Sequence, residues 1–196
     1  MLKRIESFLP NLAVCVWGDA NTEEILKDIV ICREHNIGAI SCTAVSLPVL
    51  GNLSDTARVF TFVDNPDNLK AVRVRENVSA QIFVKPDRID DISDAEGLCL
   101  IIALELSLIR HLDWNRIFSS YKRTGAAGFL FIDDNGRYIN RFYDFLGLAP
   151  TRDIEIQYCA GTNDVDVVEN AWRLVKKVRP EFLDKFRLFV TRGFFN

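Results

Sequence analysis

Short apolar runs alternate with polar, helix-like segments along this chain. The clearest unit lies in the middle, where the run Leu98–Leu106 is followed by a helix-like segment, Ser107–Thr124, and then by a second run, Gly128–Ile132. Acidic residues stand where both runs end. A strand, a helix and a strand in this order form a βαβ unit, whose parallel strands are buried on both faces. We therefore predict a parallel sheet.

Six further apolar runs extend the same pattern along the chain: Leu12–Val16, Ile37–Cys42, Arg58–Val63, Val78–Val84, Ile154–Tyr158 and Phe186–Val190. Eight parallel strands in one domain most simply close into a barrel, because closure removes both edges. We predict a compact (βα)8 TIM barrel as a single domain over residues 1–196, with brief loops, since such barrels typically have about 250 residues.

Two alternatives to this architecture remain at this stage. The eight strands could form an open, doubly wound parallel sheet instead of a closed barrel. Leu98–Leu112 could be one long buried helix, because leucine and alanine favour helices. The strand interpretation keeps the spacing of strands regular, and a continuous apolar run is typical of a central parallel strand.

Three of the predicted helices have recognisable ends or faces. Asn21 or Thr22 can cap a helix whose core face would contain Ile25, Ile29, Val30 and Cys32. Tyr138–Leu146 and Val165–Arg179 are the other two segments. Each helix would connect consecutive strands and cover the outside of the barrel.

The charge and the cysteine content of the chain limit the kinds of partner and compartment that we expect. The 196 residues carry a net charge of −3 and the pI is about 5.5, which argues against nucleic acid and against an anionic membrane surface. No apolar run approaches the ~20 residues of a membrane span, and the N-terminus lacks the features of a signal peptide. The five cysteines form no C-x-x-C pair. We expect reduced, buried thiols in a cytoplasmic protein.

Polar residues follow the predicted strands, where parallel α/β proteins place their chemistry. Lys85 comes after the fourth strand, Glu105 ends the fifth and Asp133 follows the sixth. A desolvated lysine can form a Schiff base with a carbonyl, and a nearby carboxylate can move protons. We therefore name these three residues as candidate catalytic groups. The less specific interpretation is that charged residues merely mark the points where strands stop.

The same carboxylates allow a metal hypothesis. Glu105 and Asp133, joined by Asp64 at the end of the third strand, would supply three oxygen ligands of the kind Mg²⁺ prefers. No ligand spacing is diagnostic, so we expect no cofactor and keep a Mg-dependent enzyme as an alternative. His35 and His111 lie in predicted helices, which argues against a histidine base, a serine triad or a histidine-rich zinc site.

A phosphate-binding site is the third candidate. TIM barrels often hold phosphate on backbone amides after the seventh and eighth strands. Those positions here are Gly161 and Thr162, and Arg192 and Gly193. Glycine permits a close approach of the backbone, and arginine pairs with phosphate oxygens. Thr43 and Asp64, after the second and third strands, are further candidates for binding a small-molecule substrate.

Parts of the chain resemble known barrel families. Asp133-Asp134-Asn135-Gly136-Arg137, followed by Phe142-Tyr143-Asp144-Phe145-Leu146, resembles the sixth-strand exit of (5-formylfuran-3-yl)methyl phosphate synthases, and Val190-Thr191-Arg192-Gly193 resembles their closing segment. The compact length is similar to that of phosphoribosylanthranilate isomerase. Both resemblances imply a small, aldolase-like barrel acting on phosphorylated metabolites. In the synthases, a Lys-Asn-Pro sequence stands where this chain has Thr43-Ala44-Val45.

We predict a lyase or isomerase of a small, phosphorylated carbonyl or sugar-like compound. The alternative is a catalytically silent barrel that serves as a binding or assembly module, which the missing family lysines favour. Exposed aromatic residues would then form a partner surface, although helical spacing favours a core position for Phe142: Tyr138, Phe142, Tyr143, Phe194 and Phe195. A mouth filled by Trp17 or Phe194 would favour the module. A homo-oligomer is compatible with either function.

Overall fold

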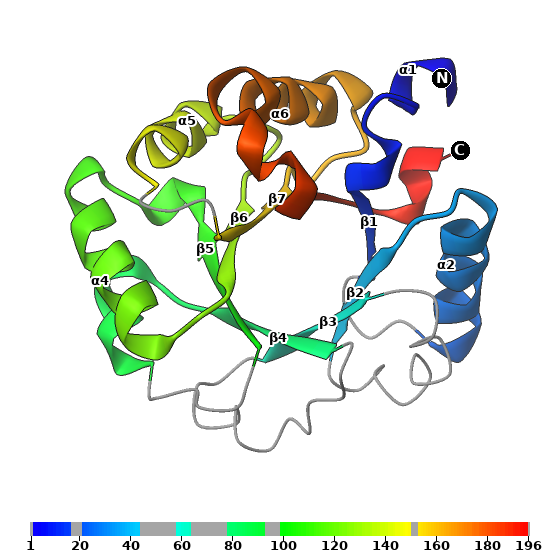
Figure 1. Cartoon of the computed structure of the whole chain (residues 1–196). Helices are drawn as coiled ribbons and strands as arrows, with labels where there is room; N and C mark the ends of the chain where they lie inside the picture. Colours follow the sequence, from blue (N-terminus) through cyan, green and yellow to red (C-terminus); the bar gives the residue numbers. More distant parts are fainter. Residues whose placement is uncertain are drawn as a thin grey trace.

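The computed structural model of the chain contains a closed barrel of parallel strands, in the order β1 to β8 (Figure 1). It describes residues 2–16, 21–43, 58–63, 78–92, 99–149 and 153–195. The strand bounds are β1 Leu12–Cys15, β2 Ala39–Thr43, β3 Arg58–Val63, β4 Val78–Phe83, β5 Leu100–Glu105, β6 Gly128–Ile132, β7 Glu155–Cys159 and β8 Phe186–Val190. The prediction of a TIM barrel is confirmed, and the open-sheet alternative is wrong.

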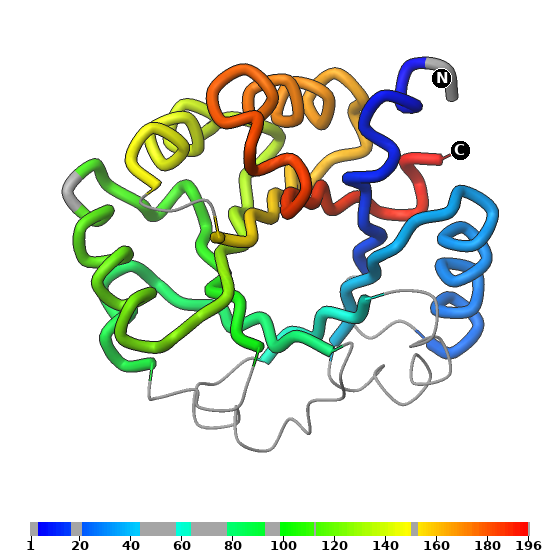
Figure 2. The backbone as a smooth tube through the Cα atoms, viewed as in Figure 1, coloured from blue at the N-terminus to red at the C-terminus, as the bar shows by residue number. Residues whose placement is uncertain are grey.

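Helices cover the outside of this ring. The α-helices are α1 Leu2–Ile5, α2 Thr22–Glu34, α4 Trp114–Thr124, α5 Ile139–Leu148 and α6 Val165–Val178. The 3-10 turns are η1 Leu9–Asn11, η4 Pro86–Asp91, η5 Leu106–Leu108, η6 His111–Asp113, η7 Pro180–Lys185 and η8 Arg192–Phe195. Figure 2 follows the backbone through strands and helices in turn.

Local signals explain the helix ends. Asn21 caps α2 by accepting a hydrogen bond from the Glu24 backbone N–H at 3.0 Å, and Asp164 caps α6 by accepting one from Asp166 at 2.8 Å. Helix α4 ends at Gly125, whose φ of 64° is the left-handed conformation that glycine adopts without strain. The predicted cap of α2 is therefore present, with Asn21 as the capping residue.

Two predicted details are wrong. Val30 is 48% exposed, so the core face of α2 consists of Ile25, Ile29 and Cys32, which are spaced by four and three residues. The predicted helix from Ser107 begins only at Trp114, because η5 and η6 precede it. The alternative of a single helix over Leu98–Leu112 is also wrong, since β5 occupies this run.

Strand alternation separates two apolar regions. Outward-facing side chains of the strands pack under the helices, as the aromatic rings of Phe131 and Phe145 do at 4.5 Å between centroids. Inward-facing side chains fill the barrel interior, where Phe60 and Phe189 meet edge to face at 5.6 Å. Successive side chains of a strand point to opposite faces, so odd and even positions of one strand enter different regions.

The N-terminal pole of the barrel is closed by a charged contact. Arg58 on β3 reaches across to Glu155 on β7, with 2.5 Å between Nη1 and Oε1, and it also donates to the Ser79 hydroxyl. Gly128 on β6 lies beside Glu155, and a Cβ at this glycine would lie 2.0 Å from the Glu155 carbonyl oxygen. In barrels of this fold, side chains meet a ligand at the opposite, C-terminal pole.

None of the helices among the described residues is long and apolar enough to cross a membrane.

Candidate functional site

The mouth of the barrel is formed by residues at the C-terminal ends of the strands. Ser41, Gln81 and Gln157 point into the interior, as the hydrogen bonds that join them show. Counting two residues at a time from these positions places Thr43, Phe83 and Cys159 on the inward side of β2, β4 and β7. Glu105 on β5 has the same parity as Ala103, which belongs to the interior cluster.

Glu105 is exposed at the end of β5. Its carboxylate accepts a hydrogen bond from the Ser107 hydroxyl in the following turn. Arg141 on α5 fixes this turn by donating to the carbonyl oxygens of Leu106 and Ser107 at 2.5 and 2.8 Å. The carboxylate is thus accessible to a ligand, and the backbone that carries it is held from the helix layer.

Lys85 lies two residues beyond β4 and is also exposed. It occupies the position before η4, with an extended backbone, and Pro86 begins the turn. Among the described residues, Lys85 has no ion-pair partner within 4.0 Å. Two candidate catalytic residues therefore stand at the ends of neighbouring strands, because β4 pairs with β5.

Asp133 lies behind its strand, not in the mouth. It follows Ile132, a neighbour of the interior cluster, so its side chain points outward, where it is completely buried. One carboxylate oxygen accepts the Tyr158 hydroxyl at 2.7 Å, and the other accepts the Tyr138 backbone N–H at 2.9 Å. Burial and the bond to Asp133 raise the pKa of Tyr158. In this arrangement Asp133 holds the start of α5 against β7.

The loops after β7 and β8 meet at the mouth. The Thr191 hydroxyl donates to Oδ1 of Asn163 at 2.6 Å, and a Cβ at Gly193 would lie 2.6 Å from Nδ2 of the same asparagine. Gly161 has a φ of 63°, and Thr162 accepts a hydrogen bond from the Asp164 backbone at 3.2 Å. Two glycine-containing loops are thus brought together where a barrel can hold an anion on backbone amides.

Arg192 turns away from this pair of loops. Its guanidinium binds the Glu24 carboxylate on α2, donates to the Glu24 carbonyl at 3.3 Å and lies 3.6 Å from the Asp28 carboxylate. Because Thr191 faces the mouth, the next residue faces the helices. The structure therefore attaches Arg192 to α2 and does not bring it together with Gly161.

The three-carboxylate metal set, kept above as an alternative, is not assembled among the described residues, which contain no group of three or more potential metal ligands. Asp133 lies behind β6 and Asp64 lies outside the described residues. Thr43, the remaining predicted ligand-binding residue, is half-buried at the end of β2. Its place at the mouth agrees with the position predicted for it.

A polar chain in the interior was not anticipated from the sequence. Ser41 donates to Gln81 at 2.9 Å, and Gln81 donates to Gln157 at 2.5 Å, across the barrel from β2 to β7. Within the described part of the chain, Nε2 of Gln157 has no hydrogen-bond partner. The sequence shows Ser41, Gln81 and Gln157 as polar residues inside apolar runs. Whether their side chains point into the barrel or outward is known only once the register of the strands is known.

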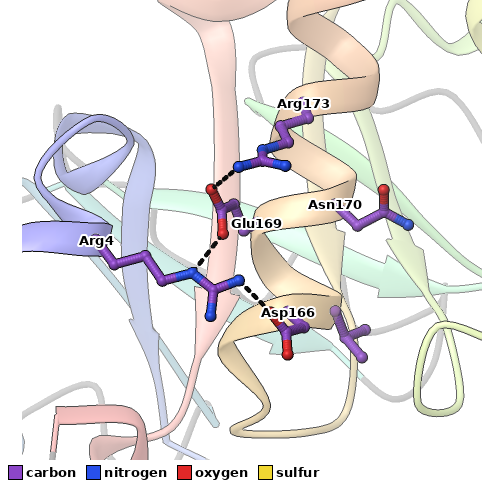
Figure 3. A pocket seen from close by; sticks show the side chains of 6 residues that line it. Arg4, Asp166, Glu169, Asn170 and Arg173 are labelled. Carbon is purple, nitrogen blue, oxygen red and sulfur yellow. Dashed lines mark hydrogen bonds and ion pairs between the residues drawn. The ribbon is translucent and has the colours of Figure 1, made fainter. Parts of the chain in front are cut away.

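A separate cleft of about 360 Å³ lies between the N-terminal segment and α6, outside the barrel. Arg4 binds Asp166 and Glu169, and Arg173 binds Glu169 at 2.7 Å, so each carboxylate has an arginine partner (Figure 3). Because these charges neutralise one another, we interpret the ion pairs as an attachment of the N-terminal segment to α6.

No protein-family model matches the chain, and no curated protein sequence is similar to it. Several solved structures share its fold, among them the following two. Phospho-2-dehydro-3-deoxyheptonate aldolase from Thermotoga maritima has 12% identity and a TM-score of 0.61 over 92% of this chain, which spans 59% of the length of the aldolase. Phosphoribosyl anthranilate isomerase from Thermococcus kodakaraensis has 13% identity and a TM-score of 0.52 over 94% of this chain and 89% of its own.

At these identities the comparison establishes the barrel fold alone. The resemblance to an aldolase-like or phosphoribosylanthranilate isomerase barrel is confirmed at that level. The more specific resemblance to the furan phosphate synthases stays a prediction.

Proposed function

We propose that this barrel binds a small phosphorylated carbonyl or sugar-like compound at its mouth and acts on it as a lyase or isomerase. Two of the solved structures that share the fold are named as an aldolase and an isomerase, and both names include a phosphorylated compound. The residues of this chain supply the rest of the argument.

The contact between Thr191 and Asn163 carries the phosphate part of the proposal. It joins the loop after β7, which carries Gly161, to the loop after β8, which carries Gly193. Backbone N–H groups without a side chain in the way are suited to phosphate oxygens. Arg192 supports this site indirectly, because its attachment to Glu24 holds the loop that carries Gly193.

Glu105 and Lys85 are the proposed reacting groups. In an isomerase, the Glu105 carboxylate takes a proton from the hydroxyl-bearing carbon next to the carbonyl and returns it to the former carbonyl carbon, while the hydroxyl proton moves to the former carbonyl oxygen. In a lyase, the Lys85 amine adds to the carbonyl, water leaves, and the resulting iminium accepts the electrons of the carbon–carbon bond that breaks. Asp133 has no step in this proposal, because both its oxygens are engaged behind β6.

Binding is tested first, with inorganic phosphate and glyceraldehyde 3-phosphate, by calorimetry and by thermal shift. We expect Thr191→Val to weaken phosphate binding three- to tenfold, or about 1 kcal/mol, because it removes the bond that joins the loops. Ser119→Ala is the matched control, since this hydroxyl only bonds within α4. Equal phosphate affinity of both variants and the parent chain would contradict the proposed site.

Chemistry is tested on the same protein. Glu105→Gln and Lys85→Met should abolish turnover of a phosphorylated carbonyl compound while the midpoint of urea unfolding stays unchanged, because both side chains are exposed. Borohydride reduction during turnover should leave a mass adduct on Lys85. Turnover without an adduct removes the Schiff-base version and leaves the isomerase version with Glu105.

A silent binding module is the second candidate. It is favoured because Asp133 and Arg192, two of the charged residues expected in the mouth, bind other residues of the chain instead: Asp133 accepts the Tyr158 hydroxyl, and Arg192 pairs with Asp28. Trp17 lies outside the described residues, and Phe194 is buried in the outer core and does not fill the mouth. The module predicts phosphate binding without turnover of any carbonyl compound in the assay above.

A further inference from the structure

An uncovered aromatic ring lies at the mouth. Phe83 is the last residue of β4, and 41% of its surface is exposed. Its ring lies 5.5 Å from that of Phe62, tilted by 32°, and Phe62 belongs to the cluster that fills the barrel interior. This contact and the parity of β4 place the ring of Phe83 on the inward side of the strand.

The neighbouring strand leaves the ring open. Phe83 pairs in register with Ala103 of β5, whose side chain is a single methyl group. Phe62, on the other side, is 9% exposed and serves as a base for the outer ring. An apolar surface that is left exposed at the strand ends favours an apolar ligand, because burial of that surface against the ligand releases water.

The opposite side of the mouth has different chemistry. In a closed ring of eight strands, β8 stands across from β4. The β7 and β8 side presents the Thr191 hydroxyl, the Asn163 amide and the backbone of Gly193. Glu105 lies on the neighbouring strand β5, two residues beyond Ala103, the register partner of Phe83. The mouth thus has an apolar side and a polar side, with the candidate carboxylate on the strand next to Phe83.

We infer that Phe83, supported by Phe62, binds a flat apolar group of the ligand, such as an aromatic or other unsaturated ring. Aromatic rings prefer offset or edge-to-face contacts with one another, and the exposed 41% of Phe83 is available for such a contact. The position of the ligand's phosphate at the other end rests on the function proposed above. The apolar contact itself depends only on Phe83 and Phe62.

The test uses four small probes and the full chain. Inorganic phosphate, phenyl phosphate and butyl phosphate are titrated by calorimetry, and benzyl alcohol is added as a ring without phosphate. We expect phenyl phosphate to bind at least tenfold more tightly than inorganic phosphate. Butyl phosphate should show a smaller gain in affinity over inorganic phosphate. Phe83→Ala should remove the advantage of the phenyl group and leave the affinity for inorganic phosphate unchanged.

Two further variants make the result specific. Phe83→Leu keeps an apolar side chain without a ring, so it should reduce the preference for phenyl over butyl phosphate. Tyr143→Ala is the matched control, because Tyr143 is an aromatic residue that is 53% exposed on α5, away from the strand ends. It should change no affinity.

The outcomes separate this inference from the proposed function. If inorganic phosphate binds but the phenyl group adds nothing, or if Phe83→Ala leaves its advantage intact, only the aromatic contact is overturned. If benzyl alcohol binds in a Phe83-dependent way while phosphate does not, the aromatic contact holds and the phosphate site fails. If no probe binds, both are overturned.

Discussion

Glu105 and Asp133 lie at the ends of neighbouring strands, and one residue of alternation gives their side chains different surroundings. Glu105 and Asp133 both follow apolar runs, yet one faces the mouth and the other is bonded to Tyr158 in the helix layer. A strand buried on both faces is apolar at every position, so its sequence hides which side chains point inward. Positions can therefore be predicted from the sequence, while directions need the register.

Asp28 on α2 is a residue-scale feature that the sequence did not reveal. It is 6% exposed, and burial raises its pKa to about 6, although Arg192 lowers it. A carboxyl group with a raised pKa in the folded state stabilises the fold at low pH, and this contribution is lost as pH rises from about 4 to about 6.

Asp28→Asn should therefore raise the free energy of unfolding at pH 8, by up to about 3 kcal/mol, and should change it much less at pH 4. The measurement is the urea midpoint at both pH values. Asp153→Asn is the control, because this carboxylate is 93% exposed and forms only a long pair with Lys185. An equal effect of Asp28→Asn at both pH values would contradict the burial argument.

At the scale of elements, apolar runs predicted the strands to within one or two residues, because a central parallel strand needs apolar side chains on both faces. The segment before α4 differed from prediction. Arg141 binds the carbonyl oxygens of Leu106 and Ser107, which removes them as acceptors for a continuous helix. Such a contact across 34 residues leaves no local signal.

Strand β6 depends on Gly128 at its start. Gly128→Ala should lower the free energy of unfolding by 3 kcal/mol or more, on the order of a severe overpacking defect, since the new Cβ would meet the Glu155 backbone. Gly147→Ala provides the opposite case: this helical position is open, so alanine should stabilise by about 0.5–1 kcal/mol. Urea midpoints measure both. A tolerated Gly128→Ala would mean that β6 and β7 can separate without loss of the barrel.

At the scale of the whole molecule, the N-terminal segment completes the outer layer. Ile5 and Phe8 are completely buried in the same cluster as Phe186, Leu188 and Val190, the outward-facing residues of β8. The sequence indicated only a short amphipathic lead-in at this end. Its partners lie more than 150 positions away, as the contacts of Arg4 and Asn11 show, so no local pattern could identify them.

Phe8→Ala tests this role. The Phe8 ring lies 5.8 Å from that of Trp172, and its removal should cost about 3–5 kcal/mol of stability, the usual range for a buried phenylalanine. Leu26→Ala, at a position that is 51% exposed, should cost well under half as much. Urea unfolding with intrinsic fluorescence measures both. Similar midpoints for the two variants would show that the segment is dispensable.

The hydrogen bonds of Asn11 have a consequence for how the barrel folds during synthesis on the ribosome. Its amide donates to the carbonyl oxygens of Leu183 and Phe186 at 2.7 and 3.0 Å and accepts the Trp172 indole at 3.2 Å. During synthesis, Asn11 cannot form its hydrogen bond to Phe186 until β8 has left the exit tunnel. Until then the nascent chain is an open sheet with exposed strand edges, which is the kind of surface that chaperones shield.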